Sequence, residues 1–319
     1  MGLSSPIQWC DGTVNPTMGC DGCELWQSQD KKNPRRSCYA GLDHERKGGN
    51  NPGFAPKFEQ VSRFQGRMEK AAAASDLRGL KHPGKPWLDG LPRLWFVSDM
   101  SDALSRSVSF EYLHTEIIDV VRSREGQRHA WLWLTKLPQR MAAFAEYVGS
   151  GRWPWNLWVG TSITEPQRVD RVDHLRAVGD ETTTRFLSVE PQHTPISLAG
   201  KLNGIAWVIQ GGESGPVTRS TALSLEQFNQ RWARPFDLAW ARQVRDECHR
   251  TKVAYFLKQL GSAPFENDRP MKLKDGHGGD WKEWPDDLRV RQMPTIVPSG
   301  VRIPPEITTE EGKTLRSAG

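Results

Sequence analysis

Short apolar segments alternate with longer amphipathic ones through most of the chain. The apolar segments are rich in β-branched and aromatic residues and lie at residues 93–97, 130–135, 157–161, 184–189, 205–210 and 253–258. Continuous apolar runs of this length are typical of strands that are buried on both faces, as in a parallel sheet. Another strand is predicted around residues 7–9, which brings the total to about seven strands.

The segments between these runs predict helices. Apolar positions recur at helical spacing in residues 110–123, and prolines mark the starts of segments 139–148 and 165–178. Residues 224–250 are long enough for one helix or two, with Pro235 marking a break. Repeated strand–helix alternation indicates βαβ units. The predicted fold class is therefore α/β, a partial or complete parallel βα barrel of about 6–8 strands.

Two regions interrupt this alternation. Residues 26–60 are polar and rich in Lys, Arg, Asn and Gly, so a long loop with little regular structure is predicted there. Residues 262–319 are rich in Pro, Gly and charge, which predicts an irregular extension, a flap or a partly disordered tail. The predicted organisation is a barrel over residues 1–261, carrying a three-cysteine loop near its start, followed by a C-terminal extension over 262–319.

Composition narrows the class of protein. Of the 319 residues, 37% are hydrophobic and 25% are charged, which suits a packed core. No apolar run reaches the ~18 residues of a membrane span, and the N-terminus lacks a signal-peptide pattern, so a cytoplasmic location without a membrane partner is predicted. The net charge of +5 permits a DNA, RNA or nucleotide partner without requiring one. The fourteen tryptophans suit a core, with base stacking as an alternative for a few of them.

Polar residues follow directly after the predicted strands. In a parallel barrel the carboxyl ends of all strands meet on one face, and that face carries the chemistry. Solvent exposure of the loops after the strands is an alternative explanation for polar residues at these positions. It accounts for the serines and aspartates, but it accounts less well for the lysines and glutamates. We therefore predict catalytic roles for Lys136, Glu190 and Lys258. The residues predicted to bind a cofactor are Ser98, Asp99, Thr161, Gln210, Gly211, Gly212, Glu213 and Ser214.

Two of these groups suggest particular contacts. Asp99 and the nearby Asp102 are candidates for binding a ribose. The paired glycines Gly211 and Gly212 would let the backbone approach a ligand, and Glu213 could accept from an ammonium or hydroxyl group, although the same residues also suit a tight turn. Neither a phosphate-binding P-loop nor a dinucleotide-binding glycine motif is present in the sequence.

Three of the five cysteines form the best candidate metal site. Cys20 and Cys23 make a C-x2-C pair, and Cys38 follows after fourteen further residues. A short glycine-containing turn points both sulfurs of such a pair at one metal. Three thiolates on a 4Fe–4S cluster leave one iron open, whereas zinc needs a fourth ligand, for which Cys10, His44 and water are candidates. The alternative is three unligated thiols.

The other reactive side chains have simpler interpretations. Cys248 is predicted to pack within a helix, and Cys10 is given no role beyond that of a possible zinc ligand. His82 lies in a proline-rich segment and is predicted to be structural. The histidines are otherwise scattered along the chain, which argues against a metal-assisted hydrolase built on paired histidines.

Several segments together resemble a known family. They lie at residues 9–20, 37–40, 134–141, 186–191, 208–215 and 256–261. With these segments the chain resembles the phage-associated three-cysteine-motif family, a group long of unknown function, over roughly residues 7–261. Members of that family look like radical S-adenosylmethionine (SAM) enzymes, distantly similar to the spore photoproduct lyase group.

The resemblance implies a specific chemistry. Cys20, Cys23 and Cys38 would hold a 4Fe–4S cluster, SAM would bind to the open iron, and an electron donor would supply the electron that cleaves SAM. The resulting radical would take a hydrogen from a nucleic acid, a nucleotide or a related substrate. The sequence departs from the usual radical SAM pattern, since its spacing is C-x2-C-x14-C rather than C-x3-C-x2-C. A zinc-stabilised nucleic-acid-binding or adaptor protein without catalysis is the alternative function.

Overall fold

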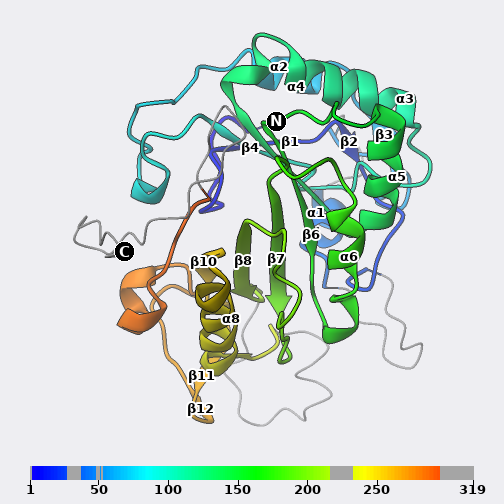
Figure 1. The fold of residues 1–319 in the computed structure, drawn as a ribbon. Helices are drawn as coiled ribbons and strands as arrows, with labels where there is room; N and C mark the ends of the chain where they lie inside the picture. Colours follow the sequence, from blue (N-terminus) through cyan, green and yellow to red (C-terminus); the bar gives the residue numbers. More distant parts are fainter. Residues whose placement is uncertain (1, 27–36, 48–50, 52, 216–232, 295–319) are drawn as a thin grey trace, which may run out of the picture. The chain divides into compact units, whose positions relative to one another are not determined.

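The structure is a computed structural model that describes residues 2–26, 37–47, 51, 53–215 and 233–294 (Figure 1). Two compact units divide the chain. The first comprises Met1–Thr161 and His174–Thr184, and the second comprises Ser162–Asp173 and Arg185–Gly319. A seven-stranded sheet has the strand order β1-β4-β5-β6-β7-β8-β10. The predicted fold class, an α/β protein built on a parallel βα sheet of partial-barrel type, is confirmed.

Parallel strands form the centre of the first unit. These strands are β1 (Gly12–Val14), β4 (Leu94–Val97), β5 (Ala130–Thr135) and β6 (Leu157–Ser162). Trp95 of β4 is in register with Trp131 of β5, which is in register with Leu157 of β6. Every residue of β4 and β6 is buried, which explains why these strands read as continuous apolar runs.

Tryptophans fill much of the core beside these strands. Trp95 stacks on Trp131 with ring centroids 6.1 Å apart, and Trp133 meets the edge of Phe144 at 5.8 Å. Each tryptophan that the structure describes is buried or half-buried. The prediction that most tryptophans serve the core is therefore confirmed for the described residues, and base stacking by a few of them stays a prediction.

The first unit contains both of its predicted helices, at residues 110–123 and 139–148, and further helices that the sequence does not predict. They are α1 (Tyr39–Lys47), α2 (Arg67–Ala72), α3 (Phe110–Leu113), the π-helix η2 (His114–Asp119), α4 (Val120–Arg122), α5 (Pro138–Val148) and the 3₁₀ turns η1 (Pro86–Leu88) and η3 (Gly126–Arg128). The predicted helix at 110–123 is one helical run that widens at η2, and α2 packs against its last turn, α4 (Figure 1). A short antiparallel pair, β2 (Thr17–Met18) with β3 (Ser62–Arg63), completes the unit.

The prediction of little regular structure over residues 26–60 is wrong for α1. This helix buries Ala40, Gly41 and His44, and a Cβ at Gly41 would lie 2.3 Å from the Trp26 ring. Close packing of small residues replaces the apolar stripe that a sequence pattern would reveal. Residues 27–36, 48–50 and 52 of the predicted loop lie outside the described residues.

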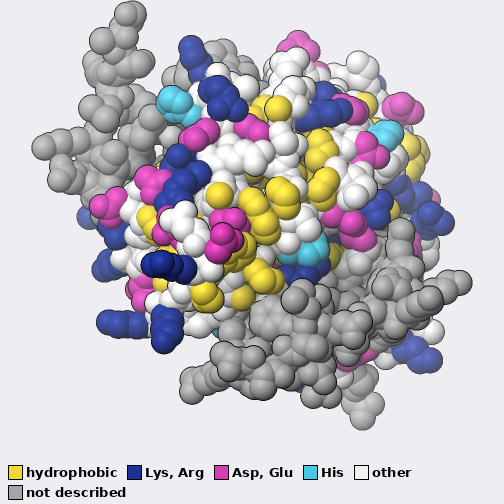
Figure 2. Space-filling view, turned by 90° about the horizontal axis from the view of Figure 1, so that it is seen from below, with side chains coloured by type: hydrophobic (Ala, Val, Ile, Leu, Met, Phe, Trp, Pro, Cys, Tyr) yellow, Lys and Arg dark blue, Asp and Glu magenta, His cyan; other side chains and the backbone are white. Residues whose placement is uncertain are grey.

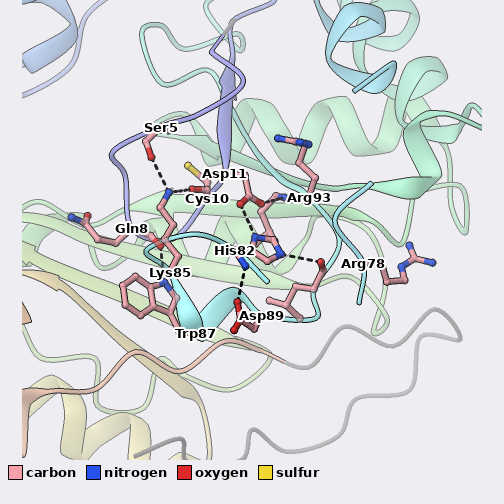
Figure 3. Close-up of polar contacts among 12 residues, drawn as sticks. Ser5, Gln8, Cys10, Asp11, Arg78, His82, Lys85, Trp87, Asp89 and Arg93 are labelled. Carbon is pink, nitrogen blue, oxygen red and sulfur yellow. Dashed lines mark hydrogen bonds and ion pairs between the residues drawn. The ribbon is translucent and has the colours of Figure 1, made fainter. Parts of the chain in front are cut away.

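The first strand also lies later than predicted, at Gly12–Val14 rather than at residues 7–9. Trp9 does point into the core, where its ring is 4.5 Å from that of Phe96. The backbone around it is not paired as a strand, because the carbonyls of Ser5, Ile7 and Cys10 all accept from the Lys85 ammonium (Figure 3). The Lys85 side chain thus takes the place of the backbone hydrogen bonds that a paired strand would make.

The second unit contains its own parallel strands. They are β7 (Arg185–Gln192), β8 (Trp207–Gly212) and β10 (Ala254–Gln259), with α8 (Leu238–Thr251) packed on β10 and β8 (Figure 1). Helix α8 begins after Pro235, as predicted, with the Asp237 carboxylate accepting from Ala239 N–H at 2.8 Å. The rest of the predicted helical region, residues 216–232, lies outside the described residues.

Smaller elements complete the description. The turn η4 (Pro166–Arg168) and helix α6 (Arg171–Arg176) occupy the predicted helix at 165–178, which is shorter than expected. A three-stranded sheet joins β9 (Phe236–Asp237), β11 (Pro264–Glu266) and β12 (Arg269–Pro270), and the 3₁₀ turns are η5 (Trp281–Glu283) and η6 (Asp286–Leu288). None of the described helices has both the length and the apolar character needed to cross a membrane.

The beginning of the C-terminal extension packs on β10. The Val290 carbonyl accepts from Leu257 N–H, and Gln292 N–H donates to the Tyr255 carbonyl, both at 2.9 Å. The Arg291 guanidinium lies 5.0 Å from the centre of the Trp281 ring and is buried. Residues 262–294 are therefore folded within the second unit, while 295–319 lie outside the described residues. The division at residue 261 stays a prediction.

Candidate functional site

The C-x2-C pair lies where the chain leaves β1. After β1 the chain passes through β2 to Cys20, whose N–H donates to the Phe58 carbonyl at 2.7 Å. Gly19 has φ +85°, and a Cβ there would be 2.8 Å from the same carbonyl oxygen, so only glycine fits. A bridge between Gly19 and Ser101 sets Cys20 beside the segment that follows β4. Cys20 therefore lies at the carboxyl ends of β1 and β4.

Cys38 is brought back to the pair by a shared backbone acceptor. The Leu25 carbonyl, two residues after Cys23, accepts from the N–H groups of Ser37 and Cys38 at 2.8 and 3.0 Å. Helix α1 begins at the next residue. Cys20 and Cys38 also pack against one buried cluster, made of Trp26, Ala40 and Phe58.

The three thiols are close enough to act on one another electrostatically. Burial is the main cause that raises the pKa of Cys20 to about 12, and Asp102, Cys23 and Cys38 raise it further. The pKa of Cys23 is raised too, first by burial, while the Lys136 ammonium opposes the rise. Cys20 and Cys23 are therefore protonated at neutral pH, and a metal or cluster that binds them must displace their protons.

The thiols do not form a finished coordination shell. Within the part of the chain that the structure describes, no group of three or more His, Cys, Asp or Glu side chains is arranged to hold a metal ion. The donor set nevertheless has the right chemistry, since three neighbouring sulfurs suit zinc or an iron–sulfur cluster. Binding would have to draw the sulfurs together, and metal binding at such sites is coupled to local folding.

The two side chains considered as a fourth zinc ligand have other surroundings. His44 is buried, with Nε2 at 2.7 Å from the Ala55 carbonyl oxygen and its ring against Phe58. Cys10 precedes β1, is fully buried, and has its pKa raised to about 12 by burial against the opposing effect of Lys85. The described contacts therefore give neither residue a role beside the other thiols.

A buried carboxylate joins the candidate metal site to the end of β5. Asp102 accepts from the Thr135 hydroxyl at 2.8 Å and from Lys136 N–H at 3.0 Å. Burial raises the pKa of this carboxyl group, and these donors oppose the rise. Thr161, at the end of β6, donates to the Thr135 carbonyl at 3.0 Å. Asp102 thus fixes the backbone from which Lys136 extends toward Cys23.

A second polar group lies at the end of β4. Asn15 donates to Asp99 at 2.5 Å and accepts from Met100 N–H, while the Tyr39 hydroxyl donates to the Asp99 carbonyl. Burial raises the pKa of the Asp99 carboxyl group. Ser98 has φ +69°, a left-handed conformation unusual for serine, and its buried hydroxyl has no hydrogen-bond partner among the described residues. Strain and an unpaired polar atom together mark this strand end.

The sequence pattern missed Asn15 and Tyr39 as members of the site. The contacts of both converge on Asp99, yet one follows β1 and the other opens α1. Their only signal in the sequence is position, because Asn15 follows directly after β1 and Tyr39 follows directly after Cys38. A pattern that looks only at strand ends would find Asn15 once β1 is correctly placed.

In the second unit, Glu190 and Lys258 form an ion pair at the ends of β7 and β10. The other predicted polar residues of this unit have partners within the protein. Gln210 is fully buried and bonds to Gln192 and Tyr255, and Ser214 accepts from the Gln259 amide. The polar strand ends of this unit thus form three separate groups: the Glu190–Lys258 pair, the contacts of Gln210, and the contact of Gln259 with Ser214.

The residues of the Gly-Gly-Glu segment also contact other residues of the protein. A Cβ at Gly212 would lie 2.4 Å from the Leu260 carbonyl oxygen, so this glycine permits close backbone packing rather than leaving an open approach for a ligand. Glu213 accepts from the Arg234 guanidinium at 2.7 Å and from Arg234 N–H at 2.9 Å. Its partner is thus an internal arginine.

A further polar cluster, at the amino ends of β1 and β4, has structural roles. His82 is buried between the Asp11 carboxylate at 2.7 Å and the Leu91 carbonyl at 3.2 Å, and Asp11 also accepts from Leu94 N–H at 2.8 Å (Figure 3). The prediction that His82 is structural is confirmed. Cys248 is likewise buried within α8, as predicted.

Fold and site together define a class: a parallel βα protein with three neighbouring thiols after its first strand. The chain belongs to the DUF5131 family, described as proteins of unknown function, whose model matches residues 4–287. Searches of curated proteins and of solved structures gave no match. A family of unknown function is thus shown, while the phage association and the radical SAM resemblance stay predictions.

Proposed function

We propose that the chain is an iron–sulfur enzyme of the radical SAM type, in which Cys20, Cys23 and Cys38 hold a 4Fe–4S cluster. The observation that carries the proposal is the placement of three half-buried thiols after β1, where Cys38 N–H donates to the Leu25 carbonyl, two residues after Cys23, and Cys20 and Cys38 pack against one buried cluster. Three sulfur ligands leave one iron open for SAM. When bound, cluster and SAM would supply the one-electron chemistry that removes hydrogen from a substrate.

The surrounding residues have proposed tasks that follow from their contacts. Lys136 favours the thiolate form of Cys23 and would balance the negative charge of a thiolate-bound cluster. The Ser98 hydroxyl has no hydrogen-bond partner among the described residues, and the half-buried Asp99 follows it at the same strand end, so both are proposed to contact the cofactor. Thr161, Gln210, Gly211, Gly212, Glu213 and Ser214 are proposed to support the strand ends through their internal contacts.

The proposed substrate is a nucleic acid, a nucleotide or a related molecule. Support comes from the net charge of +5. On the described part of the face in Figure 2, basic and acidic side chains are interspersed around hydrophobic ones. A long duplex is bound through a continuous basic surface, so the described part of this face is not proposed to bind one.

The test is reconstitution with iron and sulfide under anaerobic conditions. The protein should turn brown, bind iron and sulfide in equal amounts, and form 5′-deoxyadenosine from SAM when reduced with dithionite. Alanine at Cys20, Cys23 or Cys38 should abolish the colour. Cys10→Ala and Cys248→Ala are matched controls, since both thiols are buried away from the three ligands, and both variants should keep it. A colourless protein that takes up only zinc would contradict the proposal and favour the zinc-stabilised binding protein.

A further inference from the structure

An ion pair spans the middle strand of the second unit. Glu190 belongs to β7 and Lys258 to β10, and β8 runs between these two strands. The Lys258 ammonium donates to Oε1 of Glu190, so the two side chains meet across β8. A Cβ built on Gly211 of β8 would lie 3.5 Å from the Glu190 carboxyl carbon. This distance is an ordinary van der Waals contact, so the Glu190 carboxyl group lies directly over Gly211.

This pair keeps unused hydrogen-bonding capacity. An ammonium group has three donors and a carboxylate has two acceptor oxygens. Among the residues that the structure describes, the side chains of Glu190 and Lys258 make only the contact between Nζ and Oε1. Each side chain is 17% exposed. The neighbouring Glu213 differs, because both of its carboxylate oxygens accept from Arg234.

The arrangement of charge selects one kind of ligand. A simple anion is attracted by Lys258 but repelled by Glu190, and a simple cation meets the reverse. A zwitterion that carries a carboxylate and an ammonium on one carbon satisfies both side chains and leaves no charge unpaired in a partly buried place. When such a ligand binds, the pair between Glu190 and Lys258 is replaced by two pairs, one from each side chain to the ligand. The net charge of the site does not change.

We propose that Glu190 and Lys258 recognise the α-amino acid end of a ligand, with the ligand carboxylate on Lys258 and the ligand ammonium on Glu190. This assignment gives a ligand chemistry to two residues for which the sequence predicts catalytic roles, and it lies within the second unit and requires no metal. If the cluster does not assemble, the proposed amino acid site is therefore unaffected. If no amino acid binds, the proposed cluster is unaffected.

Calorimetric titration of the full-length protein with the standard L-amino acids tests the assignment. For each amino acid that binds, the matched amine without the carboxylate and the matched acid without the amine should bind at least about tenfold more weakly, because each leaves one charge of the pair unanswered. Glutathione carries a free α-amino acid end on a larger molecule. Its binding would identify such an end, rather than a free amino acid, as the natural ligand.

Two variants and a control locate the binding. Lys258→Met should weaken binding at least about tenfold, and Lys201→Met, which removes an exposed pair with Asp173, should leave it unchanged. Glu190→Gln keeps an oxygen for Lys258 and removes only the charge, so it preserves the fold. It should weaken amino acid binding and strengthen binding of the acid analogue, because the repulsion is gone.

The outcomes decide clearly. An acid analogue that binds wild type as tightly as its amino acid would show a plain anion site and overturn the proposal. Absence of binding by every amino acid and by glutathione would overturn it as well. If Lys258→Met fails to fold, the change of preference in Glu190→Gln still decides, provided that its thermal unfolding matches that of wild type.

Discussion

The two ends of strands β1 and β4 carry polar clusters of opposite character. At the amino ends, Asp11 and His82 pair with each other, and Asp11 also accepts from the backbone of β4. Lys85 donates to three backbone carbonyls of the N-terminal segment. Each of these charged or polar groups has its partners within the protein.

At the carboxyl ends of the same strands, the polar groups have fewer partners within the described part of the protein. Cys20 and Cys23 have raised pKa values, mainly because they are buried, and Ser98 is held in a left-handed conformation with an unpaired hydroxyl among the described residues. Burial likewise raises the pKa of Asp99. Natural proteins retain such unfavourable features where chemistry or binding needs them.

The difference shows a division of labour within one unit. A parallel βα sheet gathers stabilising contacts at the amino ends of its strands and reactive groups at their carboxyl ends. Substitutions at the amino ends should therefore cost stability without affecting the three thiols. Substitutions at the carboxyl ends should change chemistry at small cost in stability.

The largest expected effect comes from His82→Ala. This change removes a hydrogen-bond partner of the largely buried Asp11 and leaves a cavity in place of a buried imidazole ring, which together should cost about 3 kcal/mol or more. Urea denaturation should show this loss in the free energy of unfolding, while iron uptake by the folded variant stays at the wild-type level. His114→Ala is the matched control, since His114 lies 3.4 Å from an exposed Asp119 and should lose less than about 1 kcal/mol. Equal losses in both variants would remove the distinction between the two ends.

The sequence predicts the sheet well because burial on both faces leaves continuous apolar runs. Strand β5 has the predicted bounds, and β4, β6 and β10 differ from theirs by one residue at one or both ends. The start of the chain is harder to predict. Residues 5–10 are held by Lys85, about eighty positions away, and a local pattern cannot contain such a partner.

The candidate site is predictable only in part, for a related reason. Cys20 and Cys23 are linked by local spacing, but the contact of Asn15 with Asp99 joins residues 84 positions apart. Helix α1, which follows Cys38 directly, escapes detection because small residues make its packing. Strand ends could be identified as reactive positions, whereas the side chains that hold them in place could not.

A second comparison sets two buried hydroxyls at the carboxyl ends against each other. Thr135 donates to Asp102, and Thr135→Val leaves that carboxylate short of a donor, which should cost about 1–3 kcal/mol. Ser98→Ala removes a hydroxyl without a partner among the described residues, so the free energy of unfolding should stay the same or rise. Thermal and urea unfolding of both variants measure the contrast. A loss in Ser98→Ala as large as that in Thr135→Val would mean that the Ser98 hydroxyl is paired.

A smaller effect is expected for Asp99→Asn and depends on pH. Burial raises the folded-state pKa of Asp99 above the unfolded value of about 3.9, so the folded state binds the proton more tightly. The stability from this group is present at low pH and is lost as pH rises through the folded-state pKa. Asparagine cannot ionise and still accepts from Asn15. At neutral pH the variant should thus be more stable than wild type, on the order of 1 kcal/mol.

The comparison that checks this prediction is the pH dependence of urea unfolding. The advantage of Asp99→Asn should disappear at acid pH, where the carboxyl group is protonated in both states. Asp119→Asn replaces an exposed carboxylate and should show little of this dependence. If the difference in the free energy of unfolding between Asp99→Asn and wild type is the same at every pH, it arises from packing and not from ionisation of Asp99.

The smallest expected effect concerns Lys136 and bears directly on the thiols. The ammonium of Lys136 lowers the pKa of Cys23 against the larger, opposing effect of burial, so Lys136→Met should raise that pKa further. Since the thiolate is the reactive form, alkylation of Cys23 by iodoacetamide in metal-free protein should then need a higher pH. Mass spectrometry of the Cys23 peptide measures the rate, and Cys248, whose pKa is raised mainly by burial within α8, serves as the internal control. An unchanged alkylation profile would separate Lys136 from the thiols and leave the carboxyl end without the positive charge that the proposed cluster requires.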